Sequence, residues 1–196
     1  MNCNKNHMEM LELIAFCDLE INGLYDSMET EIANARTKYA MLKKVQYDKR
    51  SKAIEAISNF WNVVFANHHR LGSFFDKDLL DFLLRINVDV FNSVKLDYYR
   101  IDFYFKENPY FENSVLTKYF QLKDSVPDYI SLKQVLIKWK AHVSLNSFML
   151  PAEENKVNFI SWYVSPKERY ITDILINDIW VDPVHYYTLY ETAPVW

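Results

Sequence analysis

Apolar residues recur with a heptad-like spacing through the first part of the chain. A helical pattern runs from Glu9 to about Ile57 with only Gly23 as an interruption, and from Ile14 to Leu42 its apolar residues follow steps of three and four. The spacing predicts one continuous helix of roughly 70 Å, far longer than a small domain can cover. Such a helix needs a partner along its apolar stripe, and a second copy of the chain is the simplest one. We call this stripe the seam; it comprises Ile14, Cys17, Ile21, Leu24, Met28, Ile32, Ala35, Tyr39 and Leu42.

The charges along this helix are sorted by sign. All charged residues between positions 9 and 31 are acids, and those between 36 and 52 are bases except for Asp48. An antiparallel pair crossing near residues 32–35 sets each acidic half against a basic half, whereas a parallel pair opposes like charges. One exposed ion pair contributes only about 0–1 kcal/mol, but many pairs sorted in this way determine an orientation. The alternative is a long helix that packs on its own domain and leaves its charges solvated.

After the long helix the hydrophobic period changes to two, which predicts a sheet. In residues 95–105 one strand face carries Tyr99, Ile101, Phe103 and Phe105. Asn108-Pro109 is typical of a turn, and the chain is expected to return as a strand over residues 115–122. Flanking strands are predicted at residues 87–91 and 135–143. The alternation favours an antiparallel sheet.

Helical patterns surround the predicted sheet. We expect a helix over residues 60–75 with Ser58 as its N-cap, and another over residues 77–86. A last helix is predicted at residues 170–182, ended by Pro183. Its buried stripe is expected to be Ile171, Ile174, Leu175 and Ile179. The chain is thus predicted to be an α+β protein, with a dimerisation helix at 1–57 and an α+β domain, with helices on one side of the sheet, at 58–196.

Composition narrows the possible functions. Half of the residues are hydrophobic and 16% are aromatic, which is enough for a sizeable core. The formal net charge of -4 disfavours wholesale binding to nucleic acid and suits a basic partner. Cys3 and Cys17 make no disulfide framework, which fits a reducing compartment. The N-terminus lacks the layout of a signal peptide, and no apolar run approaches the roughly 18 residues of a membrane span, so we expect a soluble intracellular protein.

The sequence contains no convincing catalytic or metal-binding constellation. With only two glycines, it has no Gly-rich phosphate loop. His68 and His69 are adjacent and point about 100° apart on a helix, so we expect exposed or helix-capping side chains rather than a shared metal. Asp102 and Glu107 have no accompanying nucleophile or base, and Asp102 lies near Arg100, as structural charges often do. We expect a non-enzyme without a metal or cofactor.

Five segments, in the same order along the chain, resemble the nucleosome assembly protein family. The central one is YRIDFYFKENPYFENSVLTKYF, in which an R-I-x-F-x-F strand runs into an E-N-P-Y-F-x-N turn. The upstream ISNFWNVVFANHHRLGSFF is similar to the I-P-x-F-W-x-x-x-F-x-N-H segment of SET-like members. The other three segments are KYAMLKKVQYDKRSKAI, IKWK and NDIWVDPVHYY. Together the segments extend over nearly the whole chain.

The resemblance implies an antiparallel homodimer with an "earmuff" α+β domain at each end. Its concave underside is expected to bind core histones and to assist nucleosome assembly without ATP, in the nucleus and the cytoplasm, with no sequence-specific contact to nucleic acid. Asp173 and Asp178 align with acids of SET-like members and are the first candidates for histone contact. The remaining candidate acids are Glu107 and Glu112 in the turn, and Asp76, Asp78 and Asp81 by electrostatics alone.

The chain also departs from the family pattern. The loop before the last helix is acidic in SET-like relatives, but here it carries Lys167 and Arg169. Val45 and Gln46 stand where relatives often place a proline, and the long acidic C-terminal tail of the family does not follow APVW. The altered loop and the tail keep open a dimeric adaptor for a non-histone partner. A second alternative, a scaffold that inhibits a protein phosphatase, is implied only by the resemblance to the SET-like branch.

Overall fold

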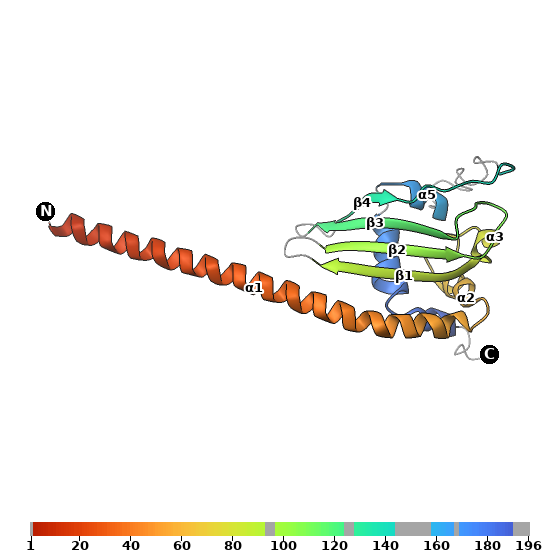
Figure 1. Ribbon diagram of the computed structural model, residues 1–196, viewed down its shortest axis with the longest axis horizontal. Helices are drawn as coiled ribbons and strands as arrows, with labels where there is room; N and C mark the ends of the chain where they lie inside the picture. The colour runs from red at the N-terminus through yellow and green to blue at the C-terminus, as the bar shows by residue number, and fades with distance from the viewer. Residues whose placement is uncertain (1, 93–96, 124–127, 144–157, 167–168, 190–196) are drawn as a thin grey trace.

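One very long helix dominates the molecule. The computed structural model describes residues 2–92, 97–123, 128–143, 158–166 and 169–189. Helix α1 spans Asn2–Glu55, 54 residues or about 80 Å, and begins several residues before the predicted start at Glu9. Its first half projects away from the rest of the chain, and its second half runs beside the edge of a sheet (Figure 1). The predicted continuous helix is therefore confirmed.

The side of α1 that packs on its own domain is not the seam. Ala33 and Ile54 are buried, and Ala40 and Tyr47 are half-buried, so the inward stripe repeats every seven residues. Every seam residue is exposed. Tyr39 of the seam directly precedes Ala40, and consecutive residues point about 100° apart on a helix. The seam and the inward stripe therefore lie on two different faces of α1.

The sheet has four antiparallel strands in the order β1-β2-β3-β4. They are β1 (Leu83–Asn92), β2 (Asp97–Phe105), β3 (Val115–Lys123) and β4 (Asp128–Gln134). Strand β1 lies next to α1. The predicted inward positions of β2 are confirmed, since Ile101, Phe103 and Phe105 are buried and Tyr99 is half-buried against the core. One face of the sheet thus belongs to the core, and the other faces outward.

Short helices supply the other side of the core. They are α2 (Phe60–Asn67), α3 (Lys77–Leu80), α5 (Phe159–Val164), α6 (Arg169–Ile174), the π-helix η1 (Leu175–Ile179) and α7 (Pro183–Thr188). In Figure 1, α6 and η1 lie behind the sheet. The predicted buried stripe of this last helix is confirmed, because Ile171, Ile174, Leu175 and Ile179 are all buried. The chain is an α+β protein.

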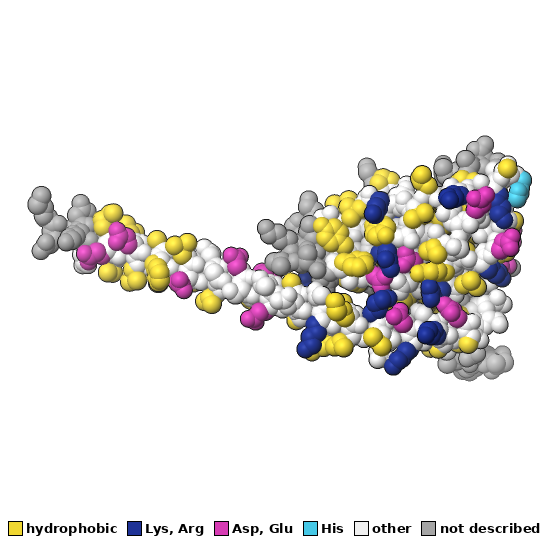
Figure 2. All heavy atoms as spheres, in the orientation of Figure 1, with side chains coloured by type: hydrophobic (Ala, Val, Ile, Leu, Met, Phe, Trp, Pro, Cys, Tyr) yellow, Lys and Arg dark blue, Asp and Glu magenta, His cyan; other side chains and the backbone are white. Residues whose placement is uncertain are grey.

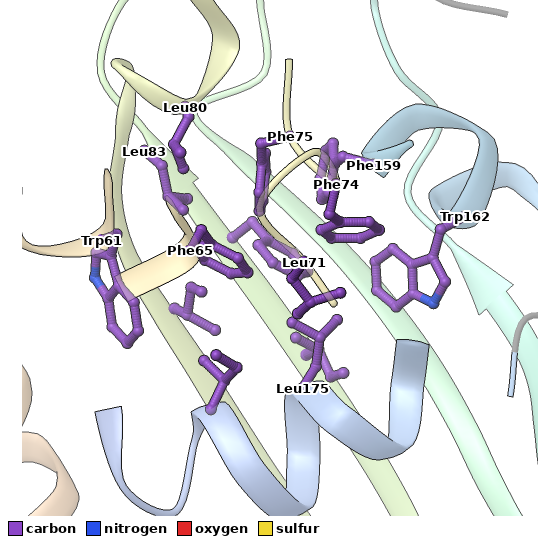
Figure 3. Packing of buried hydrophobic residues seen from close by; sticks show 14 of the residues in the cluster. Trp61, Phe65, Leu71, Phe74, Phe75, Leu80, Leu83, Phe159, Trp162 and Leu175 are labelled. Carbon is purple, nitrogen blue, oxygen red and sulfur yellow. The ribbon is translucent and has the colours of Figure 1, made fainter. Parts of the chain in front are cut away.

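Aromatic rings form the centre of this core. The ring of Phe159 stacks on Phe75 with centroids 4.5 Å apart and meets Phe103 edge-on at 5.0 Å. Phe74 and Trp162 lie beside it, as Figure 3 shows. Such edge and stacked pairs add about 0.5–1.5 kcal/mol each beyond the area that they bury. The rings connect α5 to the sheet and to the segment between α2 and α3.

A buried lysine links β3 to α5. Lys118 occupies an inward position between Leu116 and Phe120 and is 1% exposed. Its Nζ donates to the carbonyl oxygens of Trp162 at 2.5 Å and Ser165 at 2.7 Å. These are carbonyls at the C-terminal end of α5, where a positive charge complements the helix dipole. The lysine therefore caps this helix from within the core.

Two predicted elements are wrong. Residues 77–86 do not form one helix, because α3 ends at Leu80 and β1 begins at Leu83. The strand prevails because it pairs with β2 along its whole length, which outweighs a local helical pattern. Residues 135–143 do not form a strand; they meet the turn after β2 through the single bridge of Phe111 to Trp139, and β4 lies earlier, at Asp128–Gln134.

Several predicted helix boundaries are also wrong, since the helix expected over residues 60–75 ends at Asn67. The N-cap of α2 is Asn59 rather than Ser58, in the left-handed region at φ 58° and without a side-chain cap. The helix predicted over residues 170–182 ends earlier, at Ile179, and Pro183 begins a separate helix, α7. Asp182 caps that helix by accepting a hydrogen bond from the His185 amide at 3.2 Å. Proline suits the first turn of a helix, where its missing N–H would have no intrahelical partner.

Candidate functional site

Asp173 and Asp178, the first candidates for contact with a basic partner, lie on the continuous segment formed by α6 and η1. Asp173 is exposed and accepts a hydrogen bond from Asn177 Nδ2 at 2.8 Å. Within the described residues it takes part in no ion pair. Its carboxylate is therefore open to a cation from outside. Its contact with a basic partner stays a prediction.

Asp178 is engaged inside the protein. One carboxylate oxygen lies 3.2 Å from His68 Nε2, and the other accepts a hydrogen bond from the Tyr186 hydroxyl at 2.7 Å. The side chain of Asp178 is still 42% exposed. Asp178 thus joins α2 and α7 to η1, and this structural role reduces its capacity to bind a partner.

The His68 side chain is fully buried, not exposed as one of the sequence interpretations held. The Arg70 amide donates a hydrogen bond to His68 Nδ1 at 3.2 Å. The hydrogen of the neutral imidazole is therefore on Nε2, which donates a hydrogen bond to Asp178. Burial lowers the pKa of His68, although Asp178 opposes this effect. Burial, with the bond to Asp178, raises the pKa of Tyr186 to about 12. The cluster therefore holds a neutral histidine and a neutral tyrosine on one carboxylate.

Three predicted acids gather around Tyr110. Asp76, Asp78 and Asp81 lie in and beside α3, and Asp76 Oδ1 accepts a hydrogen bond from the Asp78 amide at 3.1 Å. Burial raises the pKa of the Tyr110 hydroxyl, and the three carboxylates raise it further because they disfavour a phenolate. Asp81 also accepts a hydrogen bond from Asn62 at 2.7 Å. We call Asp76, Asp78 and Asp81 the α3 acidic cluster.

The turn between β2 and β3 presents the other two predicted acids. Asn108 is buried, and its Oδ1 accepts hydrogen bonds from the amides of Tyr110 and Phe111, both at 3.0 Å. This bonding fixes the turn, while the side chains of Glu107 and Glu112 stay exposed. The predicted acids thus fall into two groups, one on α6–η1 and one around α3 and this turn.

A polar network that the sequence did not predict lies on the outer face of the sheet. Asp89 of β1 pairs with Arg100 of β2 and, at 3.5 Å, with Lys44 of α1. Arg100 also pairs with Asp102 at 3.1 Å, and Asp102 accepts a hydrogen bond from Thr117 at 2.7 Å. This network fixes the second half of α1 to three strands. It confirms that Asp102 is a structural charge.

The same structure offers no metal site in its described part. None of the groups of histidine, cysteine and acidic residues found there has three members placed to hold an ion. Within the same residues, no helix is both long enough and apolar enough to cross a membrane. The outer face of the sheet carries a mixture of cationic, anionic and apolar side chains (Figure 2).

Known proteins of similar sequence cover most of the chain. The family model described as "Nucleosome assembly protein (NAP)" matches residues 10–154. Protein SET of Drosophila melanogaster is 34% identical over 94% of this chain and 75% of its own length. Protein SETSIP of Homo sapiens is 32% identical over 93% of this chain and 67% of its own length.

Solved structures agree on the fold. Nucleosome assembly protein S of Plasmodium falciparum superposes with a TM-score of 0.69 at 22% identity, covering 90% of this chain and 99% of that one. The Vps75 histone chaperone superposes with a TM-score of 0.59 at 18% identity, covering 92% and 97%. The long helix followed by a four-stranded sheet with helices is the architecture of these proteins. The chain therefore belongs to the nucleosome assembly protein family, in its SET-like branch.

Proposed function

We propose that two copies of this chain form an antiparallel dimer that acts as a histone chaperone. Each copy contributes residues 1–57 as the dimerisation helix and residues 58–196 as the histone-binding domain. Core histones bind the acidic concave surface between the two domains, and the dimer assists nucleosome assembly without ATP or another cofactor. The proposed places of action are the nucleus and the cytoplasm.

The uncovered seam of α1 is the observation that carries this proposal. Leu24 is 70% exposed and Ile21 48% exposed on a helix that projects from its own domain. Monomeric proteins rarely leave such a continuous apolar stripe in water. The charge pattern of α1 favours an antiparallel orientation of the two helices, since acids occupy its projecting half and bases occupy its second half (Figure 2). An antiparallel partner buries the stripe and neutralises both halves.

A groove beside the seam supports the same arrangement. It has a volume of about 970 Å³ and is lined by α1, by residues from both faces of β1 and β2, and by η1. Three seam residues form part of its α1 wall, so a helix packed on the seam would lie along the opening of the groove. The residues that line it include Ile32, Ala35, Tyr39, Phe91, Tyr99 and Trp180.

The proposed mechanism is competition for histone charge. Free histones can be trapped on DNA in wrong complexes, because DNA is a dense polyanion. Exposed carboxylates such as Asp173 and those of the α3 acidic cluster would cover the basic histone surface with a weaker field than that of DNA. Correctly placed DNA then displaces the chaperone. Because these contacts are ionic and exposed, their affinity decreases as salt increases.

A histone pull-down across a salt series tests the proposed function. The full chain is immobilised and presented with purified core histones, and we expect strong binding at low salt that weakens steeply as salt is raised. A dimer that binds no histone even at low salt would contradict the chaperone. That result would favour the adaptor, and a phosphatase titration with the same protein would then test the inhibitory scaffold.

A further inference from the structure

A second pocket lies at the other end of the domain, where α1 passes into α2. It has a volume of about 510 Å³ and is distinct from the groove beside the seam. The end of α1, the start of α2, the segment from α3 to β1 and the end of β2 all contribute to it. Its walls are partly apolar and partly polar, and its lining includes Ile54, Trp61, Asn62, Asp81, Leu83 and Tyr104.

An unpaired donor lies in this lining. Trp61 is 2% exposed, and its indole Nε1 has no hydrogen-bond partner among the described residues. In Figure 3 the indole nitrogen points away from Phe65 and Leu71, so it does not face the centre of the core. A buried N–H without a partner is costly, and native proteins rarely leave one unsatisfied. An acceptor that enters the pocket would satisfy this donor once the lining around Trp61 opens.

An unpaired acceptor lies beside it. Asn62 donates through Nδ2 to Asp81 Oδ1 at 2.7 Å, and a carboxylate can only accept, so the orientation of the amide is defined. The buried Asn62 Oδ1 is left without a partner. The ligand must therefore bring both an acceptor for Trp61 and a donor for Asn62. A peptide unit has its C=O and N–H side by side and meets both needs.

The charge around the pocket favours a cationic ligand. Asp81 belongs both to the pocket and to the α3 acidic cluster, which continues toward Tyr110. On the other wall, Arg85 pairs with Glu55 at 3.3 Å and stacks on the Tyr104 ring at 3.8 Å. The positive charge of Arg85 is thus compensated locally. Lys106 also lines the pocket, but its single charge stands against the three carboxylates of the cluster, which form no ion pair within the described residues.

We propose that this pocket binds the main chain of an extended basic peptide, with Trp61 donating to a carbonyl and Asn62 accepting from an amide. Lysine or arginine side chains of the peptide lie along the α3 acidic cluster. This inference builds on the proposed function, in which histones are the cargo and their basic tails the natural source of such a peptide. The pocket is a contact for the histone tail, and it shares the α3 acidic cluster with the surface proposed to cover the histone.

The indole N–H resonance of Trp61 provides a direct readout. The ¹⁵N-labelled full chain has five tryptophans, and the resonance of Trp61 is assigned by its loss in Trp61→Phe. A short peptide of alternating lysine and alanine serves as the probe, with a glutamate–alanine peptide and a main-chain N-methylated lysine–alanine peptide for comparison. We expect the lysine–alanine peptide to shift this resonance in a saturable way, and the other two to leave it in place.

Variants test the individual contacts. Trp61→Phe keeps the ring and removes the donor, and we expect about fivefold weaker peptide binding, the equivalent of one neutral hydrogen bond. Asp81→Asn, which removes a charge in the pocket, should also weaken binding. Asp48→Asn is the matched control, because it removes an exposed carboxylate on α1 outside the pocket. Equal losses for Asp81→Asn and Asp48→Asn would overturn the assignment.

The outcomes separate this inference from the proposed function. A Trp61 resonance that does not move at saturating peptide, or that moves equally with the N-methylated peptide, overturns the assignment of the pocket as a peptide-binding site. In that case intact histones could still bind the dimer. Conversely, a shifted Trp61 resonance without any binding of intact histones supports the pocket and contradicts the chaperone. The shift is measured on the unmodified chain, so it stands even if a variant fails to fold.

Discussion

Placing charge on the seam should separate the proposed dimer into single chains. The perturbation is the pair Ile21→Asp and Leu24→Asp, two positions that are 48% and 70% exposed in one copy. Full burial of one such side chain contributes about 1.5–3 kcal/mol, so covering the exposed share of both residues in both copies contributes on the order of 5 kcal/mol. The new carboxylates add a desolvation penalty. We therefore expect association to weaken by at least about a thousandfold.

Sedimentation equilibrium of the full chain measures this change. Leu19→Asp is the matched control, because Leu19 is also 70% exposed but lies about half a turn around α1 from the axis of the seam. We expect the control to remain a dimer, and the double variant to be monomeric or insoluble. A soluble, folded dimer of the double variant would refute the assignment of the seam.

Three further predictions concern the domain itself. Asp173→Lys should weaken histone binding about fivefold or more without altering thermal stability, whereas Asp178→Asn should cost about 1 kcal/mol of stability, because His68 and Tyr186 lose their carboxylate partner. Equal stabilities would contradict this division of roles. Lys118→Met should lower the free energy of unfolding in urea by about 3 kcal/mol, because two helix-end carbonyls lose a charged donor; an unchanged midpoint would count against it. Burial lowers the folded-state pKa of His68, so the unfolded chain binds more protons and stability should fall as pH drops below about 6.5. Part of this dependence should disappear in His68→Gln, and identical pH profiles would exclude the histidine as its source.

The long helix was predictable because its information is local. The three-four spacing, together with the absence of proline before Pro109, specifies a helix without reference to the rest of the fold. The alternation over residues 95–105 identified a strand for the same reason. Residues 77–86 were misassigned because their apolar residues satisfy a helix and a buried strand equally, and only the pairing with β2 decides between them.

The polar contacts of the domain depend on residues far apart in the sequence, which a periodic pattern cannot report. Lys118 interrupts the apolar face of β3. Its role is explained only by the folded structure, in which it donates a hydrogen bond to a carbonyl at the end of α5. Asp178 was chosen by its resemblance to family acids, but its bond to His68 joins positions 110 residues apart. The pocket at Trp61 likewise needs three separate segments. The sequence was enough to identify the candidate acids, but it could not show which of them form hydrogen bonds inside the protein.

The separation between equivalent residues of the two copies tests the antiparallel dimer most directly. A spin label at Glu20→Cys, with Cys3→Ser and Cys17→Ala, lies about 13 to 14 residues from the proposed crossing at residues 32–35. At 1.5 Å per residue, dipolar spectroscopy should give a distance of about 40 Å between the two labels. A distance below about 20 Å would show parallel helices, and the loss of any dipolar signal at concentrations well above that of a stable dimer would show single chains. Either result would contradict the account.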